Sequence, residues 1–301
     1  MTSITRDLSS ALLAVDREHR PVNVGLAAQL ACLLEVSAPK PGNVSPGRHF
    51  ADLRYEDFLV SALAIGEPMA RAGQRGVGAT IRLAVEASLR LARSNTNLGI
   101  VLLFAPLARA ASLRSSEEAS GTLQAIARRV IEATTIEDAR EAYAAIRLAR
   151  PGGLGRAGEQ DISTDPAMSL ADVMRLAAHR DTIASEYATG FEVTFGTAVP
   201  ALERARRDGL PWDDAVVETF LELLAALPDT HIARRNSVAL AVEISARARR
   251  VVDAGGVRSD AGRQAIEEFD RSLRDSRNSG NPGTTADLTA AAIFVVLLGD
   301  N

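Results

Sequence analysis

The sequence predicts an all-α protein, a single compact bundle of about ten helices in one domain that spans residues 1–301. Alanine and leucine dominate the chain, aromatic residues make up only 4% of it, and the alternating β-branched pattern of strands is rare. With 47% hydrophobic residues in 301, the chain is long enough to bury a large core. We therefore expect a folded helical protein rather than a disordered one.

Apolar residues recur three and four positions apart along most of the chain, which is the spacing of one face of a helix. The first such pattern is formed by Leu26, Leu30, Leu33 and Leu34. Taken in order, the patterns and the breaker residues between them predict helices around residues 26–34, 58–63, 81–89, 94–111, 117–133, 136–150, 170–189, 200–207, 213–226, 232–253, 261–274 and 286–298.

Two helix starts carry a capping signal. Thr135 precedes Asp138, and Ser169 precedes Asp172, at the three-residue spacing of a capping box with Asp in place of Glu. We expect each hydroxyl to accept a hydrogen bond from a free backbone N–H of the first turn.

Charge and composition exclude several classes of protein. A net charge of -4 and a pI of about 5.7 disfavour nonspecific binding to nucleic acid. Cys32 is the only cysteine, so no disulfide forms within the chain, and a reducing cytoplasm is the simplest compartment. The N-terminus lacks the order of a signal peptide, and no apolar run reaches the roughly 18 residues that span a bilayer. We expect a soluble cytoplasmic protein without a membrane or nucleic-acid partner.

Lys40 is the only lysine in the chain, and it lies between two prolines in the segment Ser37-Ala-Pro-Lys-Pro-Gly-Asn-Val44. Every other basic residue is an arginine. A lysine presents one compact ammonium, whereas an arginine presents a planar fork, so a lysine suits a site where one charge meets a phosphate oxygen. The alternative is that Lys40 is an ordinary solvated residue of a loop.

Polar residues gather in five stretches between or at the starts of the predicted helices, at residues 37–49, 94–99, 151–168, 228–235 and 278–287. The third stretch is longer than the roughly two to eight residues that usually connect helices. Because it also presents Glu159, Asp161 and Asp165, we interpret it as a ligand-binding loop, with disorder as the alternative.

Three of the other stretches place polar groups at helix starts. Asn95 and Asn97 precede a long apolar helix, at a position where phosphate is held by backbone N–H groups and the helix field, although ordinary capping gives the same pattern. Asp229 comes before His231 and Arg235, which share one helical face, and Asp229 is alternatively a plain N-cap. In the last stretch, Thr284 and Asp287 have capping-box spacing, and Gly280 and Gly283 give backbone freedom.

A metal site, if any, should hold magnesium. The four histidines are scattered and the single cysteine supplies no thiolate pair, which disfavours zinc. Carboxylates and carboxamides suit Mg²⁺, which is usually shared with phosphates of a substrate. The chain contains no P-loop motif, and no Gly-x-Gly-x-x-Gly motif follows a predicted strand, so a nucleotide needs another kind of site.

Taken in order, these motifs resemble those of the triphosphoribosyl-dephospho-CoA synthase family, and most closely the branch found in archaea and methylotrophic bacteria. The resemblance covers residues 35–288 and rests on Glu35-Val-x-x-Pro-Lys-Pro-Gly-Asn-Val44 with His49, Asn95-Thr-Asn97 with Gly99, Asp229-Thr-His231 with Arg235, and Asn281-Pro-Gly-x-x-Ala-Asp-Leu288.

The resemblance implies an all-helical transferase in which the 2'-hydroxyl of dephospho-CoA displaces adenine from C1' of ATP. It assigns catalysis to Glu35, Asp229 and Asp287, and Mg²⁺ binding to Asp229, Asp287 and Asp161. The residues expected to bind the nucleotide or its phosphates are Lys40, Pro41, Gly42, Asn43, His49, Asn95, Asn97, His231, Arg235, Asn281 and Gly283.

Several alternatives stay open. Thr96-Asn97-Leu98-Gly99 lacks a lysine that these synthases carry, and the acidic loop matches the archaeal branch, so the acceptor is alternatively a precursor of a pterin C1 carrier, tetrahydromethanopterin. Two alternatives from other classes are a noncatalytic helical binding protein and a Mg²⁺-dependent N-glycoside hydrolase. Helical chains with alanine-rich faces often form homodimers, which is a further expectation.

Overall fold

The computed structural model of the protein describes residues 23–92, 96–116, 119–153, 155 and 157–299. Over these residues the protein is all-α, as predicted: no strand occurs, and one isolated bridge joins Ser45 to Arg48. There are more helices than the ten expected. They are α2 (Val24–Ser37), α3 (Tyr55–Ala64), α4 (Gly66–Ala70), α5 (Val77–Leu91), α6 (Leu98–Ser115), α7 (Leu123–Glu132), α8 (Ile136–Ala149), α9 (Leu170–Ala177), α10 (Thr182–Thr189), α11 (Val199–Arg207), α12 (Trp212–Ala226), α13 (Thr230–Arg235), α14 (Val238–Asp253), α15 (Asp260–Leu273) and α16 (Gly283–Leu298).

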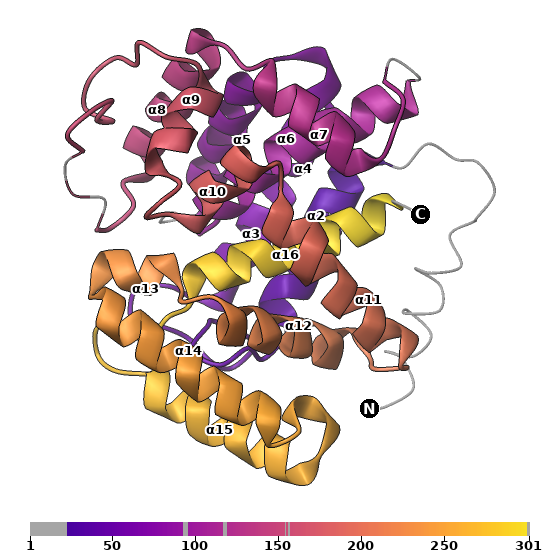
Figure 1. Cartoon of the computed structure of the whole chain (residues 1–301), viewed down its shortest axis with the longest axis vertical. Helices are drawn as coiled ribbons and strands as arrows, with labels where there is room; N and C mark the ends of the chain where they lie inside the picture. The colour runs from indigo at the N-terminus through magenta and orange to yellow at the C-terminus, as the bar shows by residue number, and fades with distance from the viewer. Residues whose placement is uncertain (1–22, 93–95, 117–118, 154, 156, 300–301) are drawn as a thin grey trace.

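Helix α16 crosses the centre of the molecule and lies between two groups of helices, α5 to α10 on one side and α11 to α15 on the other (Figure 1). It packs against α2, α6, α11 and α12. From Leu288 to Val295 every residue is buried, as expected for a helix that is apolar or small on all its faces. Phe294 stacks on Phe104 of α6 with ring centroids 4.3 Å apart. This packing places the first turns of α16 at the boundary between the two groups.

Both predicted capping sites are confirmed. Thr135 and Asp138 form a complete capping box at the start of α8, and the hydroxyl of Ser169 accepts from the backbone N–H of Asp172 at the start of α9. The capping-box spacing of Thr284 and Asp287 does not mark a cap. Helix α16 begins at Gly283, one residue before Thr284, and Pro282 occupies the N-cap position.

Two predicted helices are each divided in the structure. The stretch 170–189 is divided at Asp181, which caps α10, and the stretch 232–253 is divided at Ser237, which caps α14. In both cases a short polar side chain takes the backbone N–H groups that a continuous helix would bond to its own carbonyls, so the chain turns. Each break falls beside the cleft described below.

Helix α6 passes a test of length and hydropathy for a membrane span, and it alone does so among the described helices. Two thirds of it, 67%, is buried inside the protein, and it packs against α5, α7 and α16. Its apolar character therefore matches that of a core helix.

Candidate active site

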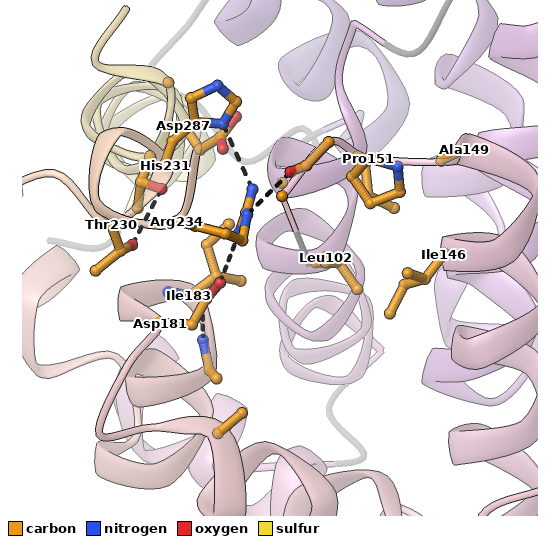
Figure 2. Close-up of a pocket in the computed structure, with 18 of the residues that line it drawn as sticks. Leu102, Ile146, Ala149, Pro151, Asp181, Ile183, Thr230, His231, Arg234 and Asp287 are labelled. Atoms are coloured by element: carbon orange, nitrogen blue, oxygen red, sulfur yellow. Dashed lines mark hydrogen bonds and ion pairs between the residues drawn. The ribbon is translucent and has the colours of Figure 1, made fainter. Parts of the chain in front are cut away.

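A cleft of about 1770 Å³ opens between the two groups of helices. Residues of α8, α9 and the segment 151–162 line one side of it, and residues of α13, the start of α16 and the start of α10 line the other (Figure 2). Common small-molecule sites enclose roughly 300–1,000 Å³. The cleft is thus large enough for more than one ligand of nucleotide size.

The Asp287 carboxyl lies in this cleft without a hydrogen bond or ion pair to any other described residue. Burial raises the pKa of Asp287 well above its ordinary value, and the nearby charges of Glu35 and Asp229 raise it further. Gly99 at the start of α6 makes room for this group, because a Cβ on Gly99 would lie 2.0 Å from Asp287 Oδ2. Three polar stretches far apart in the sequence therefore meet at Asp287.

Glu35, in the last turn of α2, lines the same cleft and is paired with Lys40. Lys40 Nζ lies 2.9 Å from Glu35 Oε1, and it also donates to the backbone carbonyls of Glu35 and Ala38. The Lys40 side chain is 0% exposed and does not line the cleft. Its ammonium thus has its partners inside the protein, where a buried charge must be paired.

Both carboxylate oxygens of Asp229 accept hydrogen bonds from neighbouring parts of the chain. Its Oδ1 accepts from the N–H of Ile232 at 3.0 Å and caps α13, while Oδ2 accepts from the N–H and the hydroxyl of Thr285, both at 2.8 Å. Burial raises the pKa of this carboxyl, and the hydrogen bonds that it accepts oppose the rise. Asp229 thereby fixes α13 to the first turn of α16, and its charge acts on Asp287.

A neutral histidine faces the cleft from α13. Arg234 Nη1 pairs with Asp181 at 3.0 Å, and Arg234 Nη2 lies 3.4 Å from Nδ1 of His231 (Figure 2). Burial, and then the charges of Arg234 and Arg235, lower the pKa of His231 to about 4. Because an arginine only donates, Nδ1 accepts and Nε2 carries the proton. Nε2 is buried and has no partner among the described residues.

The remaining lining divides into a cationic part and an apolar part. Arg150, Arg180 and Arg235 are exposed, and their guanidinium groups bond to no other described residue. Across the cleft from α13 lie the apolar side chains of Ile146, Ala149 and Pro151 (Figure 2), and Leu102 and Ile183 add further apolar lining.

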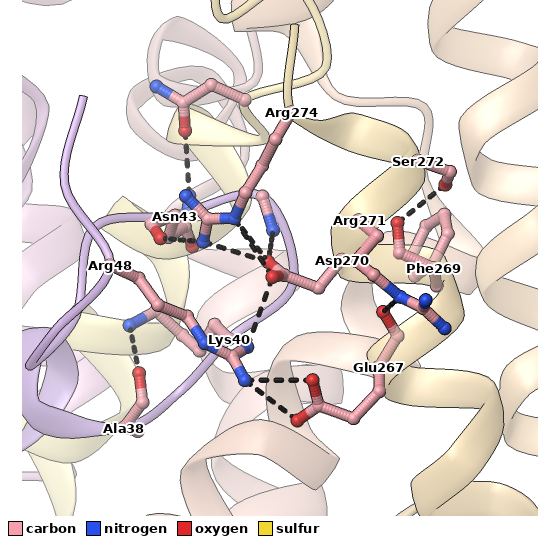
Figure 3. Close-up of polar contacts among 12 residues, drawn as sticks. Ala38, Lys40, Asn43, Arg48, Glu267, Phe269, Asp270, Arg271, Ser272 and Arg274 are labelled. Atoms are coloured by element: carbon pink, nitrogen blue, oxygen red, sulfur yellow. Dashed lines mark hydrogen bonds and ion pairs between the residues drawn. The ribbon is translucent and has the colours of Figure 1, made fainter. Parts of the chain in front are cut away.

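The loop that carries Asn43 is anchored to α15 (Figure 3). Asp270 accepts from the N–H of Gly42 at 2.8 Å and from Arg274 Nε at 2.9 Å, and Arg274 Nη2 donates to the carbonyl of Asn43 at 2.6 Å. Arg48 adds a bond from Nη1 to Asp270 at 3.1 Å. The loop is thus held by a buried carboxylate and two arginines.

The structure brings many of the predicted site residues to the cleft and places others elsewhere. Those that line the cleft are Glu35, Asn43, Asp161, His231, Arg235, Asn281, Gly283 and Asp287. Those that do not are Lys40, Pro41, Gly42, His49, Asn97 and Asp229. Asn95 lies outside the described residues.

Like Lys40, Gly42 and Asp229, the residues Asn97 and His49 lie away from the cleft and have structural partners. Asn97 is 6% exposed, and its Nδ2 donates to Ser88 Oγ at 3.1 Å. His49 Nδ1 accepts from the N–H of Tyr55 at 3.3 Å. Both side chains therefore connect neighbouring segments to each other.

The carboxylates do not form a preassembled metal site. Among the described residues no group of three or more His, Cys, Asp or Glu side chains is placed to hold a metal ion. Asp229 already accepts three hydrogen bonds, and Asp161 accepts from the N–H groups of Ala157 and Ser163 within its own loop. These described carboxylates thus do not form a three-ligand metal site by themselves.

Sequence reasoning missed the pairs Asp181–Arg234 and Asp270–Arg274. The spacing of Asp270 and Arg274, four residues apart on one helix, predicts their ion pair but not the contact with Gly42, which is 228 residues away. Nothing local in the sequence identifies Asp181 as both a helix cap and a partner of an arginine.

Comparison with known proteins gives one consistent result. A family model described as ATP:dephospho-CoA triphosphoribosyl transferase matches residues 21–301. A protein of Pseudomonas syringae pv. tomato named as a 2-(5''-triphosphoribosyl)-3'-dephosphocoenzyme-A synthase is 35% identical over 106 residues, which cover 35% of this chain and 36% of that protein. A protein of Pseudomonas putida with the same name is 30% identical over 149 residues, or 46% of this chain and 51% of that protein. The matched part is thus at most about half the length of these relatives.

A solved structure agrees with these matches. The crystal structure of a protein from Archaeoglobus fulgidus, named as a triphosphoribosyl-dephospho-CoA synthase, has a TM-score of 0.61 and 27% sequence identity. The similarity covers 81% of this chain and 100% of that one.

Proposed function

The chain belongs to the ATP:dephospho-CoA triphosphoribosyl transferase family, and on that premise we propose that it transfers the triphosphoribosyl group of ATP to the 2'-hydroxyl of dephospho-CoA. The observation that carries the proposal is a cleft with room for two ligands, in which the Asp287 carboxyl has a raised pKa and no partner among the described residues. A group of this kind is suited to take a proton from an attacking hydroxyl near neutral pH.

Asp287 is the proposed proton acceptor. The 2'-hydroxyl oxygen of the acceptor bonds to C1' of the donor ribose, and its proton passes to Asp287 as the bond between C1' and N9 of adenine breaks. The electron pair of that bond leaves with adenine. The N–H at Nε2 of His231, which has no partner among the described residues, is a hydrogen-bond donor for the departing base. The proton on Asp287 then passes to adenine, so that adenine leaves as a neutral base and Asp287 is a carboxylate again.

The guanidinium groups of Arg150, Arg180 and Arg235 are proposed to bind the triphosphate, because they are exposed at the cleft and have no partner among the described residues. Lys40 is assigned a supporting role: it pairs with Glu35, whose charge adds to the effect of burial in raising the pKa of Asp287. Because Mg²⁺ is usually held by one or two carboxylates together with the phosphates of a substrate, we assign it to the ATP substrate.

The apolar part of the cleft supports an acceptor with a long, weakly polar arm. Dephospho-CoA carries pantetheine, whose methylene and methyl groups would contact Leu102, Ile146 and Ile183. A pterin precursor would bring a flat ring instead. A cytoplasmic location accords with the single buried thiol of Cys32.

Product analysis separates the proposal from its alternatives. The protein is incubated with MgATP, with and without dephospho-CoA, and free adenine and the mass of the acceptor are measured. Adenine that appears only with dephospho-CoA, together with a triphosphoribosyl adduct, supports transfer. Adenine released without an acceptor indicates a hydrolase. Adenine released only with a pterin precursor indicates that this precursor is the acceptor. If no adenine is released and titration with ATP gives no heat, the protein is a noncatalytic scaffold that binds another partner.

A pair of variants tests the role of Asp287. Asp287→Asn should lower the rate of adenine release by about 10²- to 10⁴-fold, the usual contribution of a positioned acid or base. Asp253→Asn, a change of the same kind at an exposed position on α14 outside the cleft, should leave the rate unchanged. Equal rates of adenine release in the two variants would show that Asp287 takes no part in the reaction.

A further inference from the structure

Asn43 presents an unpaired hydrogen-bond acceptor to the cleft. Its side chain lines the cleft and is only 6% exposed, and its Nδ2 donates to Oδ1 of Asn281 at 2.8 Å. Its Oδ1 is buried and has no partner among the described residues. A buried carbonyl without a donor costs free energy, so such an atom in a binding cleft indicates a partner that arrives with the ligand.

The amide is held in a fixed place. The carbonyl of Asn43 accepts from Arg274, and the preceding Gly42 is bonded to Asp270 (Figure 3). Gly42 has a φ of +77°, and a Cβ there would lie 3.0 Å from the carbonyl oxygen of Gly280 in the loop that carries Asn281. The two amides thus come from loops that are packed against each other, and neither loop moves freely.

The two amides offer a defined pattern of hydrogen bonds. Oδ1 of Asn43 is a free acceptor, and Nδ2 of Asn281 is a donor without a partner among the described residues. Adenine has the complementary edge, since its 6-amino group donates and its neighbouring ring nitrogen accepts. Guanine and hypoxanthine carry a carbonyl oxygen at position 6, which would face Oδ1 of Asn43. Reversing the pattern would require both amides to turn together.

We propose that Asn43 and Asn281 form a base-reading subsite that selects adenine over 6-oxopurines. The inference rests on the proposed function, because it names the part of the same cleft that recognises the base. ATP and dephospho-CoA both contain adenine, so the chemistry alone does not say which ligand is read here. Binding measured for each ligand separately answers that question.

Isothermal titration tests the subsite with MgATP, MgITP, dephospho-CoA and its hypoxanthine analogue. For the ligand that is read, the natural protein should bind the adenine form about 10- to 100-fold more tightly than the 6-oxo form. Asn43→Ala should weaken the adenine form by a similar factor and change the 6-oxo form little. Asn281→Ala should instead raise the affinity for the 6-oxo form, because the Asn43 amide is then free to turn.

Asn236→Ala is the matched control, since Asn236 lies in a nearby turn and donates to the carbonyl of Ser279 without lining the cleft. It should leave both affinities unchanged. Equal affinity of the natural protein for adenine and 6-oxo forms of both ligands, or an equal loss for both forms in Asn43→Ala, would overturn the proposal. If the protein binds the adenine form more tightly than the 6-oxo form but releases no adenine, the subsite is supported and the proposed reaction is rejected. Equal transfer rates for ATP and ITP, together with equal rates for dephospho-CoA and its hypoxanthine analogue, would support the reaction and reject the subsite.

Discussion

Replacing Lys40 with methionine should destabilise the protein far more than the loss of an exposed ion pair would. The Lys40 side chain is 0% exposed and that of Glu35 is 6% exposed. Methionine keeps much of the volume of lysine but leaves the Glu35 carboxylate buried without its counter-charge. Removing one partner of a buried pair costs about 3–5 kcal/mol.

The size of the effect on the melting temperature follows from the length of the chain. At about 2.1 cal/mol/K per residue, 301 residues give an entropy of unfolding of about 0.6 kcal/mol/K. The loss in free energy of unfolding should thus lower the melting temperature, followed by circular dichroism, by about 5–8 °C.

Arg71→Met is the matched control, because Arg71 and Glu67 lie at a similar distance of 3.0 Å but both side chains are 60% exposed. Loss of an exposed pair costs at most about 1 kcal/mol, so the melting temperature should fall by less than about 2 °C. A double variant with Lys40→Met and Glu35→Gln should recover part of the loss, since no charge is left unpaired. The reasoning fails if Lys40→Met melts like Arg71→Met, or if the double variant is the least stable of the three.

Three further predictions concern the cleft. The pKa of Asp287 is raised in the folded protein, so this carboxyl lowers the free energy of unfolding once the pH exceeds its unfolded pKa of about 3.9. Asp287→Asn should therefore have a higher melting temperature than the natural protein at neutral pH, and the same melting temperature in acid. Gly99→Ala should displace Asp287 and lower adenine release by about 100-fold, while Gly196→Ala, where a Cβ meets nothing within 4 Å, should be neutral. Arg274→Met removes the bond to the Asn43 carbonyl and should raise KM for the nucleotide more than it lowers kcat.

Each of these predictions has a clear contrary result. An Asp287→Asn variant that melts lower than the natural protein at neutral pH would mean that the carboxylate is stabilising. Equal rates for Gly99→Ala and Gly196→Ala would show that the close approach at Gly99 does not position the reactive group. A fall in kcat at constant KM in Arg274→Met would indicate that the arginine acts on the reaction step rather than on nucleotide binding.

The sequence was informative where structure is set by neighbours along the chain. The all-helical class and the caps at Thr135 and Ser169 follow from local spacing and are confirmed. The family resemblance, read from four motifs, is confirmed by the family model over residues 21–301. The breaks at Asp181 and Ser237 were not predicted, because the apolar pattern continues through both positions and only the polar caps divide the helices.

The partners of the site residues depended on contacts across the fold. Lys40 was noticed because it is unique, but the same feature gave no sign that its ammonium would be paired with Glu35. The anchoring of Asn43 by Arg274 joins positions 231 residues apart, so no local pattern contains it. Burial of Asp270 among three donors is likewise a property of packing rather than of spacing.

Three acids near the cleft hold the structure together, whereas Asp287 does not. Glu35 is paired with Lys40, Asp181 caps α10 and pairs with Arg234, and Asp229 caps α13 and fixes α16. Burial raises the pKa of Asp287 most, and the charges of these three acids, which their own partners hold nearby, raise it further. If Asp287 takes the proton as proposed, its pKa depends on these neighbours as well as on burial, and removing the partners of the neighbours should change it.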